Sequence, residues 1–468
     1  MSDRTLRTPF PERASAALKD TFLQQALGIA TTKFIGLRQE SFAGFPEGEA
    51  LRDRARAVKE ATLQKLDGYL AELADNVERL GGHAHWAATG EEAREIIRRL
   101  GRDRGLRRAV KSKSMATEEI DLNEALEAAG VTPVETDLGE YIIQLAHEKP
   151  SHIIAPAIHK TKGQVAELFS KELKGHFAAD PEVLTAAARK ELRQKFLQAD
   201  MGITGANFAV ADTGTVVLVT NEGNGRMVTS LPRIHVAVMG IEKVIPSMTD
   251  LMLFLAILAR SATGQKLSVY TTLVRGPRHA GELEGPEEFH LILLDNGRSA
   301  QIAGKLREAL YCLRCGACLN VCPVYRQIGG HAYGHTYPGP IGILLTAMLK
   351  GDRSVKELAH ASSLCGACQE VCPVRIDIPR MLVELREGLD RGRIAPWGER
   401  LVFKMLGRVL GSPMLFALAG RLGRVAQKPF VSDGRLTRLP LVFGRWTKSR
   451  DLPPVAAKTF TRRWKDLR

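Results

Sequence analysis

The chain reads CLRCGACLNVCP from Cys312 to Pro323, and this stretch decides the fold around it. Its C-x2-C-x2-C-x3-C-P spacing is that of bacterial ferredoxins, in which three cysteines bind one iron–sulfur cluster and the fourth binds its neighbour. A shorter copy, CGACQEVCP, runs from Cys365 to Pro373, and the two stretches contain all seven cysteines of the chain. The repeat predicts an α-helical, ferredoxin-like domain with two clusters over residues 298–390, and two clusters indicate a path for electrons.

The ferredoxin rule divides the cysteines between the two clusters. The first is predicted to be a 4Fe-4S cluster on four thiolates: Cys312, Cys315, Cys318 and Cys372. The second is predicted to use the remaining three: Cys322, Cys365 and Cys368. A zinc ion fits this pattern badly, because zinc prefers two C-x2-4-C pairs around one tetrahedral site. A disulfide framework is not expected either, because the number of cysteines is odd.

The second motif lacks one cysteine. In a complete repeat its first cysteine would stand at position 362, where the chain has Ser362. The second cluster is therefore predicted to be a 3Fe-4S cluster, or a 4Fe-4S cluster whose last iron binds Ser362, water, another side chain or a partner's ligand. An open iron could bind substrate, whereas a relay with an unusual ligand is the simpler interpretation.

Upstream of the cysteines, apolar strands alternate with helices. This alternation predicts an α/β domain over residues 81–297 with a mixed or parallel sheet, after a helical region over residues 1–80. The clearer predicted strands lie at residues 83–87, 109–110, 153–155, 208–211, 216–220, 234–239, 267–273 and 289–294. The segments 202–207 and 211–215 are predicted to lie between strands, where they could line a pocket or form tight turns. Neither matches the dinucleotide fingerprint or the P-loop.

The stretch KSKSM from Lys111 to Met115 is a candidate anion site. It follows a predicted strand and precedes a helix that is predicted to begin at Thr117 with a capping box. Lysines and free N–H groups at such a place can bind a carboxylate or a phosphate. Solvated lysines beside an ordinary helix cap are the alternative interpretation.

The positive charge of the chain is confined to its last part. The chain carries a net charge of +14, and residues 391–468 alone hold 18 Lys and Arg against four acids, so the rest sums to zero. Residues 401–422 are predicted to form an apolar-faced helix within this basic C-terminal region. Such a region can dock an acidic partner, which we favour, or an anionic membrane surface. Nucleic acid is not an expected partner, because no nucleic-acid-binding fold accompanies the charge.

The sequence favours a cytoplasmic location. The first twenty residues are charged throughout and show no secretory signal. The longest apolar run, residues 251–259, is far shorter than the roughly 20 residues that span a bilayer. A peripheral position on the inner face of the membrane, through the basic region, is an added option.

Four stretches of the chain resemble one known family: ETDLGEYIIQLAHEKPSHIIAPAIHK from residue 135, GITGANFAVADTGTVVLVTNEGNGRM from 202, LPRIHVAVMGIEKV from 231 and CLRCGACLNVCPVYRQIGGHAYGHTYPGPIG from 312. They are similar to the iron–sulfur subunit of the bacterial L-lactate utilisation complex, the lactate utilisation protein B family. The similarity runs over nearly the whole chain. The cysteine motif alone is shared with many electron carriers, so the specificity comes from the α/β stretches.

The resemblance implies a flavin-independent oxidation of L-lactate to pyruvate by an assembly of three subunits. The two partners would be a cysteine-rich iron–sulfur protein and a small protein that shares the α/β domain. The resemblance also implies an α/β domain similar in fold to coenzyme A transferases and sugar-phosphate isomerases. It implies three cysteines in the second motif, as found here, and assigns no lactate-binding residue.

Three functions are compatible with these observations. The chain could be an electron-transfer subunit, which is the function we favour. It could instead be a catalytic subunit that binds lactate in the α/β domain through Lys111 or Lys113 and oxidises it beside the open-iron cluster. It could also be an iron–sulfur redox sensor or assembly scaffold without turnover.

Overall fold

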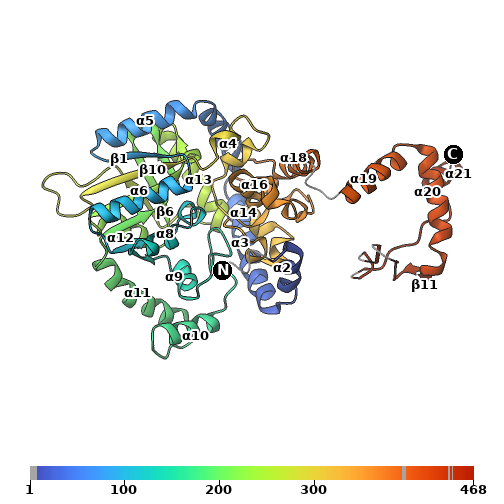
Figure 1. Cartoon of the computed structure of the whole chain (residues 1–468), viewed down its shortest axis with the longest axis horizontal. Helices are drawn as coiled ribbons and strands as arrows, with labels where there is room; N and C mark the ends of the chain where they lie inside the picture. Colours follow the sequence, from blue (N-terminus) through green and yellow to red (C-terminus); the bar gives the residue numbers. More distant parts are fainter. Residues whose placement is uncertain (1–7, 393–396, 441–442, 445, 449, 468) are drawn as a thin grey trace. The chain divides into compact units, whose positions relative to one another are not determined.

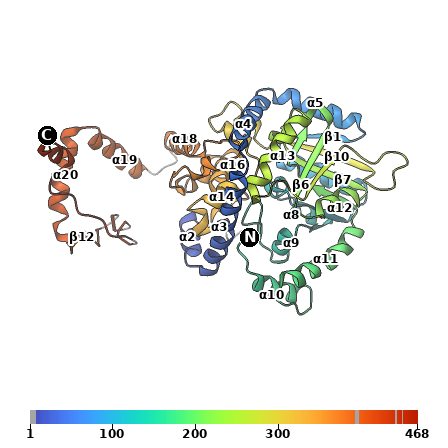
Figure 2. The ribbon, with the colours of Figure 1, turned by 180° about the vertical axis from the view of Figure 1, so that it is seen from behind.

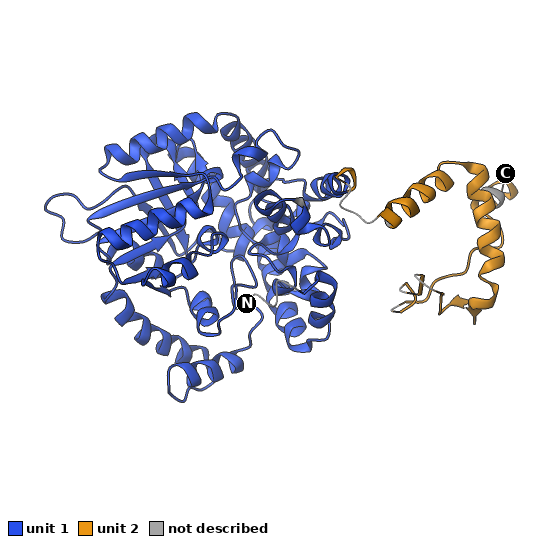
Figure 3. Cartoon of the chain, in the orientation of Figure 1, with its two compact units in different colours: residues 1–389 blue, residues 390–468 orange. Residues whose placement is uncertain are grey.

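A computed structural model describes residues 8–392, 397–440, 443–444, 446–448 and 450–467. The chain divides into two compact units, residues 1–389 and residues 390–468 (Figure 3). The predicted helical region 1–80 and basic region 391–468 both include residues that lie outside the described ranges. The first unit contains the α/β part and all the cysteines, and each unit is described by itself.

The first unit is built around a six-stranded sheet in which every neighbouring pair of strands is parallel. Its strands, in spatial order, are β1 (His83–Ala87), β10 (Glu288–Leu294), β7 (Ile234–Gly240), β4 (Met201–Thr204), β2 (Arg108–Lys111) and β3 (Thr132–Glu135). All seven residues of β7 are buried. Central parallel strands are covered on both faces, which explains their nearly continuous apolar sequence. The predicted α/β domain with a parallel sheet is confirmed.

Helices cover both faces of this sheet (Figures 1 and 2). Successive residues of a strand point to opposite faces, and β2 shows this directly. Ala109 packs with α6 (Gly90–Asp103) and α8 (Leu122–Ala128) in one apolar core. Val110 packs on the other face with α9 (Leu138–Leu145), α10 (Lys162–Glu172), α11 (Pro181–Leu197) and α12 (Asn224–Ser230).

A second, four-stranded sheet has the order β8-β5-β6-β9. These strands are β5 (Phe208–Val210), β6 (Thr215–Thr220), β8 (Val244–Ile245) and β9 (Tyr270–Val274). The turn between β5 and β6 is the short helix η1 (Ala211–Thr213), followed by Gly214 at φ +67°. Helix α13 (Met248–Thr263) follows β8, and Ser247 caps it.

The N-terminal helices join the sheet to the cysteine region. They are α2 (Phe10–Ala17), α3 (Thr21–Ala43), α4 (Gly48–Gln64) and α5 (Leu66–Arg79). Helix α3 lies against α13 and also against α14 (Ala317–Val321) and α15 (Tyr325–Ile328), as Figures 1 and 2 show. The cysteine region also contains η4 (Arg307–Tyr311), α16 (Gly339–Lys350), α17 (Ala367–Glu370) and α18 (Ile378–Arg391).

Two local predictions were wrong. Residues 153–155 form no strand, because His152 Nδ1 accepts hydrogen bonds from the backbone N–H groups of Ile154 and Ala155. A side chain that takes backbone donors in this way competes with the pairing of a sheet. Residues 202–204, predicted to lie between strands, belong instead to β4 and are buried between β7 and β2.

The second unit has two apolar-faced helices, α19 (Trp397–Leu410) and α20 (Pro413–Ala426), a short β11–β12 pairing (Val431–Ser432 with Arg435–Leu436) and α21 (Phe460–Asp466). The single helix predicted over 401–422 is therefore two helices. The chain breaks at Ser412, which caps α20 by accepting from Leu415 N, and Pro413 follows it. Among the described residues no single helix has the length and apolarity to cross a membrane. The helical segments 400–410 and 413–426 reach that length and apolarity only when they are counted together, and the chain bends by 108° between them.

Candidate iron–sulfur centres and the adjoining pocket

The two cysteine motifs adopt the same local backbone. In the first, Arg314 and Gly316 have φ of +63° and +77°, and α14 begins at the next residue. In the second, Leu364 and Gly366 have φ of +55° and +85°, and α17 begins in the same way. Glycine adopts this left-handed conformation without the steric cost that a Cβ brings. The sequence repeat is therefore also a structural repeat, in which each loop presents its thiols around a short helix.

Ser362 takes the position of the missing cysteine. In the first motif Cys312 Sγ accepts a hydrogen bond from Arg314 N at 3.4 Å. In the second motif Ser362 Oγ accepts from Leu364 N at 3.2 Å, two residues on in the same way. The serine oxygen thus occupies the place in the turn that the cysteine sulfur occupies in the first motif.

The fold brings the two motifs together, because α14 lies against α17. Cys372 lies near the thiols of Cys312 and Cys315, although it comes from the second motif. Cys322 of the first motif lies correspondingly near the thiols of Cys365 and Cys368. Cys312, Cys315, Cys318 and Cys372 also line one small cavity together. The division of the seven cysteines between two clusters stays a prediction. The first group is buried, whereas Cys365 in the second group is exposed.

Burial favours the protonated thiol at three of the cysteines unless a metal binds them. It raises the pKa of Cys315 and Cys368 to about 12, and that of Cys372 to about 11. A metal ligand must be the thiolate, so binding displaces the proton. Backbone N–H groups are aimed at the sulfurs, as from Ile376 to Cys372 Sγ at 3.4 Å, and such donors stabilise thiolate charge. The donor set and its surroundings fit iron–sulfur clusters.

The sequence pattern of the cysteines, which differs from two C-x2-4-C pairs, is what disfavours a single zinc ion. Zinc binds thiolates at about 2.3 Å, so all its sulfur ligands lie within about 4.6 Å of one another. Among the described residues, one group of three or more metal-ligating side chains has its ligand atoms within 4.8 Å, namely Glu148, His159 and His331. No three cysteine sulfurs of the described chain form a group this tight.

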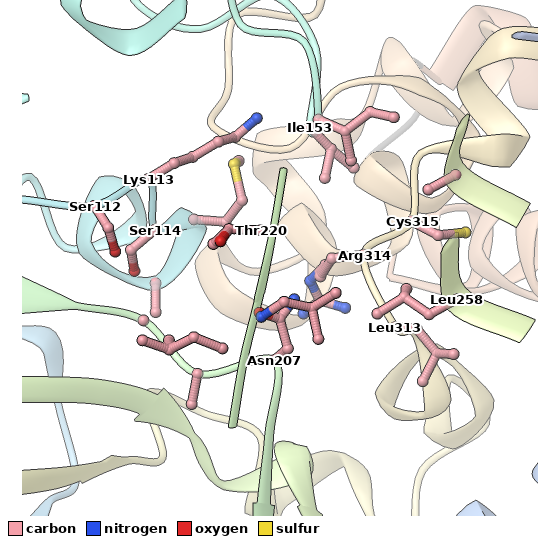
Figure 4. A pocket seen from close by; sticks show the side chains of 18 of the residues that line it. Ser112, Lys113, Ser114, Ile153, Asn207, Thr220, Leu258, Leu313, Arg314 and Cys315 are labelled. Atoms are coloured by element: carbon pink, nitrogen blue, oxygen red, sulfur yellow. The ribbon is translucent and has the colours of Figure 1, made fainter. Parts of the chain in front are cut away.

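A cavity of about 380 Å³ adjoins the first group of cysteines. It lies at the carboxyl ends of β2, β4 and β7, which is where open parallel sheets usually bind ligands. Ser112, Lys113 and Ser114 line one side of it and Arg314 and Cys315 the other (Figure 4). The cavity therefore reaches from the sheet to a predicted ligand of the first cluster.

The two candidate lysines have different surroundings. Lys111 Nζ is buried and donates to Glu135 Oε1 at 2.6 Å and to Asn123 Oδ1 at 2.5 Å, so its charge is already compensated. Lys113 lines the cavity, and its Nζ has no hydrogen-bond partner in the described part of the chain. Of the two, Lys113 is thus the one available to a ligand.

The predicted cap of the next helix was wrong. Helix α7 (Met115–Glu119) begins two residues before Thr117, and Ser114 caps it by accepting from Thr117 N at 3.3 Å. The local sequence offers a serine and a threonine three residues apart, and the serine is used because the helix starts directly after the end of β2. The lysine-rich stretch is thus a tight strand-to-helix turn.

Comparisons with known proteins agree with this architecture. Residues 70–294 match the family model of the LUD domain, and residues 308–376 match that of the 4Fe-4S dicluster domain. Lactate utilization protein B of Bacillus licheniformis is 45% identical over 462 residues, which cover 98% of this chain and 97% of the relative. Lactate utilization protein B of Bacillus subtilis is 45% identical over 447 residues, covering 95% and 93%. This chain belongs to the lactate utilization protein B family.

Membership confirms the resemblance read from the sequence, and with it an iron–sulfur component and a role in lactate utilization. A crystal structure of a DUF162 family protein from Deinococcus radiodurans aligns with 49% of this chain and 98% of its own, at 14% identity and a TM-score of 0.27. That likeness is too low to bear on the fold. The similarity to coenzyme A transferase folds stays a prediction.

In this member of the family, buried cations surround the first group of cysteines. Lys243 Nζ donates to the carbonyl oxygen of Cys312 at 3.0 Å, and Arg52 Nη2 donates to that of Cys372 at 2.9 Å. Burial, with repulsion from Arg314, lowers the pKa of Lys243 to about 7. Reduction adds negative charge to a cluster, so positive neighbours favour the reduced form and raise the potential.

Glu242 compensates part of this positive charge. Its two carboxylate oxygens accept from Arg298 Nε at 2.6 Å and from Arg314 Nη2 at 3.0 Å. Arg298 also pairs with Glu119 at 2.7 Å, and Tyr337 donates to the same carboxylate. This network ties the ends of β7 and β10 to the cysteine loop. Sequence analysis missed this network. The one sign of it in the sequence was Arg314, a charged residue between Cys312 and Cys315.

Proposed function

We propose that this chain is the electron-transfer iron–sulfur subunit of a complex that oxidises L-lactate to pyruvate. The observation that carries the proposal is the order of the groups across the first unit. Cys315 of the buried group lines the cavity, Cys318 lies near Cys368 of the second group, and Cys365 is exposed. Two adjacent clusters in this order would lead electrons from the interior of the unit to its surface.

The cluster types are part of the proposal. A 4Fe-4S cluster would bind to the first group, which has four cysteines. The second group offers three cysteines, with Ser362 Oγ in the turn position of the fourth. EPR of the anaerobic protein separates a 4Fe-4S cluster with an oxygen ligand from a 3Fe-4S cluster at that site.

The proposal is tested by the anaerobic complex of this chain with its two proposed partner subunits, the cysteine-rich iron–sulfur protein and the small α/β protein. L-lactate is expected to bleach the visible absorption of the clusters at least as fast as the complex turns over. The control is the same complex with C318A, which lacks a ligand of the first cluster. Pyruvate formation while the clusters of the unaltered chain stay oxidised would show that electrons take another route.

The second unit is proposed to dock the partner subunits. Deleting residues 393–468 is expected to weaken capture of the partners by about tenfold or more, because charge complementarity and exposed apolar helices are both lost. Iron content is expected to stay unchanged, since residues 1–389 form a compact unit of their own. Pull-down under anaerobic conditions measures both. The milder variant K404Q/R408Q/R421Q keeps α19 and α20 and isolates the effect of charge.

The same samples show whether the second unit docks partner subunits or a membrane surface. Sedimentation with vesicles containing anionic lipid is expected to be weak for the full chain and little changed by the deletion. Partner capture that survives the deletion, together with loss of vesicle binding, would assign the second unit to the membrane surface instead.

A further inference from the structure

Lys113 carries a buried ammonium group without a partner. Its Nζ is shielded from solvent and makes no hydrogen bond to any described residue. The residue stands just after β2 and lines the cavity beside the cysteine loop. Buried charges in proteins are normally paired or hydrogen-bonded, because an isolated one loses its hydration without compensation. The position therefore suits an anion that the chain itself does not supply.

The neighbouring carboxyl groups do not fill this role. Glu140, Asp137 and Glu222 act on Lys113 electrostatically, but none comes within the 4.0 Å of an ion pair. Glu140 Oε1 is itself buried without a hydrogen-bond partner. Burial raises the pKa of Glu140 well above its ordinary range and that of Glu222 to about 7, and burial lowers the pKa of Lys113. A bound anion would therefore favour the charged form of Lys113.

The other cations that line the cavity are already engaged. Arg298 and Arg314 share Glu242, and Lys243 donates to the carbonyl oxygen of Cys312. One unmatched ammonium remains, and it matches a single negative charge. A phosphate dianion would add a second charge close to Asp137 and Glu222, which also line the cavity. The balance of charge therefore favours a monocarboxylate.

Asn207 offers a second polar group to the same ligand. Its Oδ1 accepts from Val219 N at 2.9 Å, which fixes the amide, while its Nδ2 donates no hydrogen bond within the described chain. Apolar side chains such as Leu218 and Leu258 form part of the remaining wall. A fixed amide donor suits a hydroxyl or oxo oxygen, and such mixed lining is typical of small-molecule sites.

We propose that this cavity binds a small monocarboxylate with a neighbouring hydroxyl or oxo group, with Lys113 pairing with the carboxylate and Asn207 binding the second oxygen. The inference rests on the proposed function for the identity of that carboxylate as lactate or pyruvate. Cys315 lies on the same cavity, so the ligand would be held beside the first cluster. The α/β part of the chain would then be the substrate-binding part of the subunit.

The test is anaerobic calorimetry on the full, cluster-loaded chain with L-lactate, pyruvate and the neutral analogue lactamide. L-lactate and pyruvate are expected to bind, whereas lactamide is expected not to bind. K113M is expected to weaken binding by about 10- to 100-fold, the value of a charged hydrogen bond in a site that excludes water, and K113R to restore part of it. The control is K190M, which removes an exposed lysine of α11. Equal affinity of K113M and the unaltered chain would overturn the proposal.

A second variant guards against a purely structural role of Lys113. A206F fills part of the cavity with a larger side chain and leaves every charge in place. It is expected to abolish carboxylate binding, and the EPR signal of the first cluster should then no longer respond to L-lactate. If K113M unfolds and A206F binds carboxylates normally, Lys113 serves only the fold and the site is refuted. Binding of phosphate without binding of carboxylates would refute the site as well. Carboxylate binding without cluster reduction in the complex would spare this site and refute the proposed function alone.

Discussion

Replacing Cys372 by alanine is expected to remove the first cluster, although Cys372 belongs to the second motif. Cys372 lines one small cavity together with Cys312, Cys315 and Cys318. Alanine would leave the fourth iron of this buried cluster without a ligand atom, whereas the second loop offers Ser362 at that position. C322A is expected to do the reverse and remove the second cluster, because Cys322 lies near Cys365 and Cys368. Each variant should lose about half of its iron and sulfide, and EPR should show which signal disappears.

The control for both is S363A, which changes an exposed serine in the second loop and leaves every sulfur in place. It should retain the full iron content. If C372A lost the signal of the second cluster and kept the first, each motif would hold its own cluster, and the crossed arrangement would be wrong. The experiment thus tests the ligand sets independently of any activity.

The backbone of the two cysteine loops could be predicted because local sequence dictates it, whereas the crossed arrangement of the ligands stays a prediction. Gly316 and Gly366 stand at the same place in each motif, and both adopt the left-handed backbone that starts the following helix. The parallel sheet was predictable for a similar reason, since continuous apolar stretches such as residues 234–239 alternate with helices. The backbone of each loop and the apolar run of each strand depend on neighbours in the chain, whereas the order of the strands in the sheet does not.

The pocket could not be predicted in the same way, because it depends on contacts between distant segments. Lys111 and Lys113 are two residues apart and would share one face if the strand continued. Strand β2 ends at Lys111, and the turn that Ser114 caps sends the two side chains into different surroundings. One meets Glu135, and the other meets the cavity. Periodicity gives no sign of this separation.

Replacing Glu242 by glutamine is expected to lower the stability of the first unit strongly. E242Q removes the carboxylate that Arg298 and Arg314 share and leaves two buried guanidinium groups with less compensation. Breaking a buried ion pair from one side usually costs about 3–5 kcal/mol. We expect that loss in the free energy of unfolding, seen as a lower midpoint in anaerobic urea denaturation of the cluster-loaded chain.

The pH dependence gives the same prediction a second readout. Burial opposes the charge of Glu242, but Arg298 and Arg314 outweigh it and lower its pKa to about 2. A carboxylate with a depressed pKa stabilises the fold fully above its unfolded pKa of about 4.3, and the effect is lost as pH falls toward 2. The difference between the unaltered chain and E242Q should therefore shrink as pH falls below about 4.3. The control is E91Q, which alters an exposed glutamate of α6 that also pairs with two arginines. It should leave the midpoint of urea denaturation unchanged at every pH. Equal effects of E242Q and E91Q would show that the buried network adds no more stability than a surface ion pair.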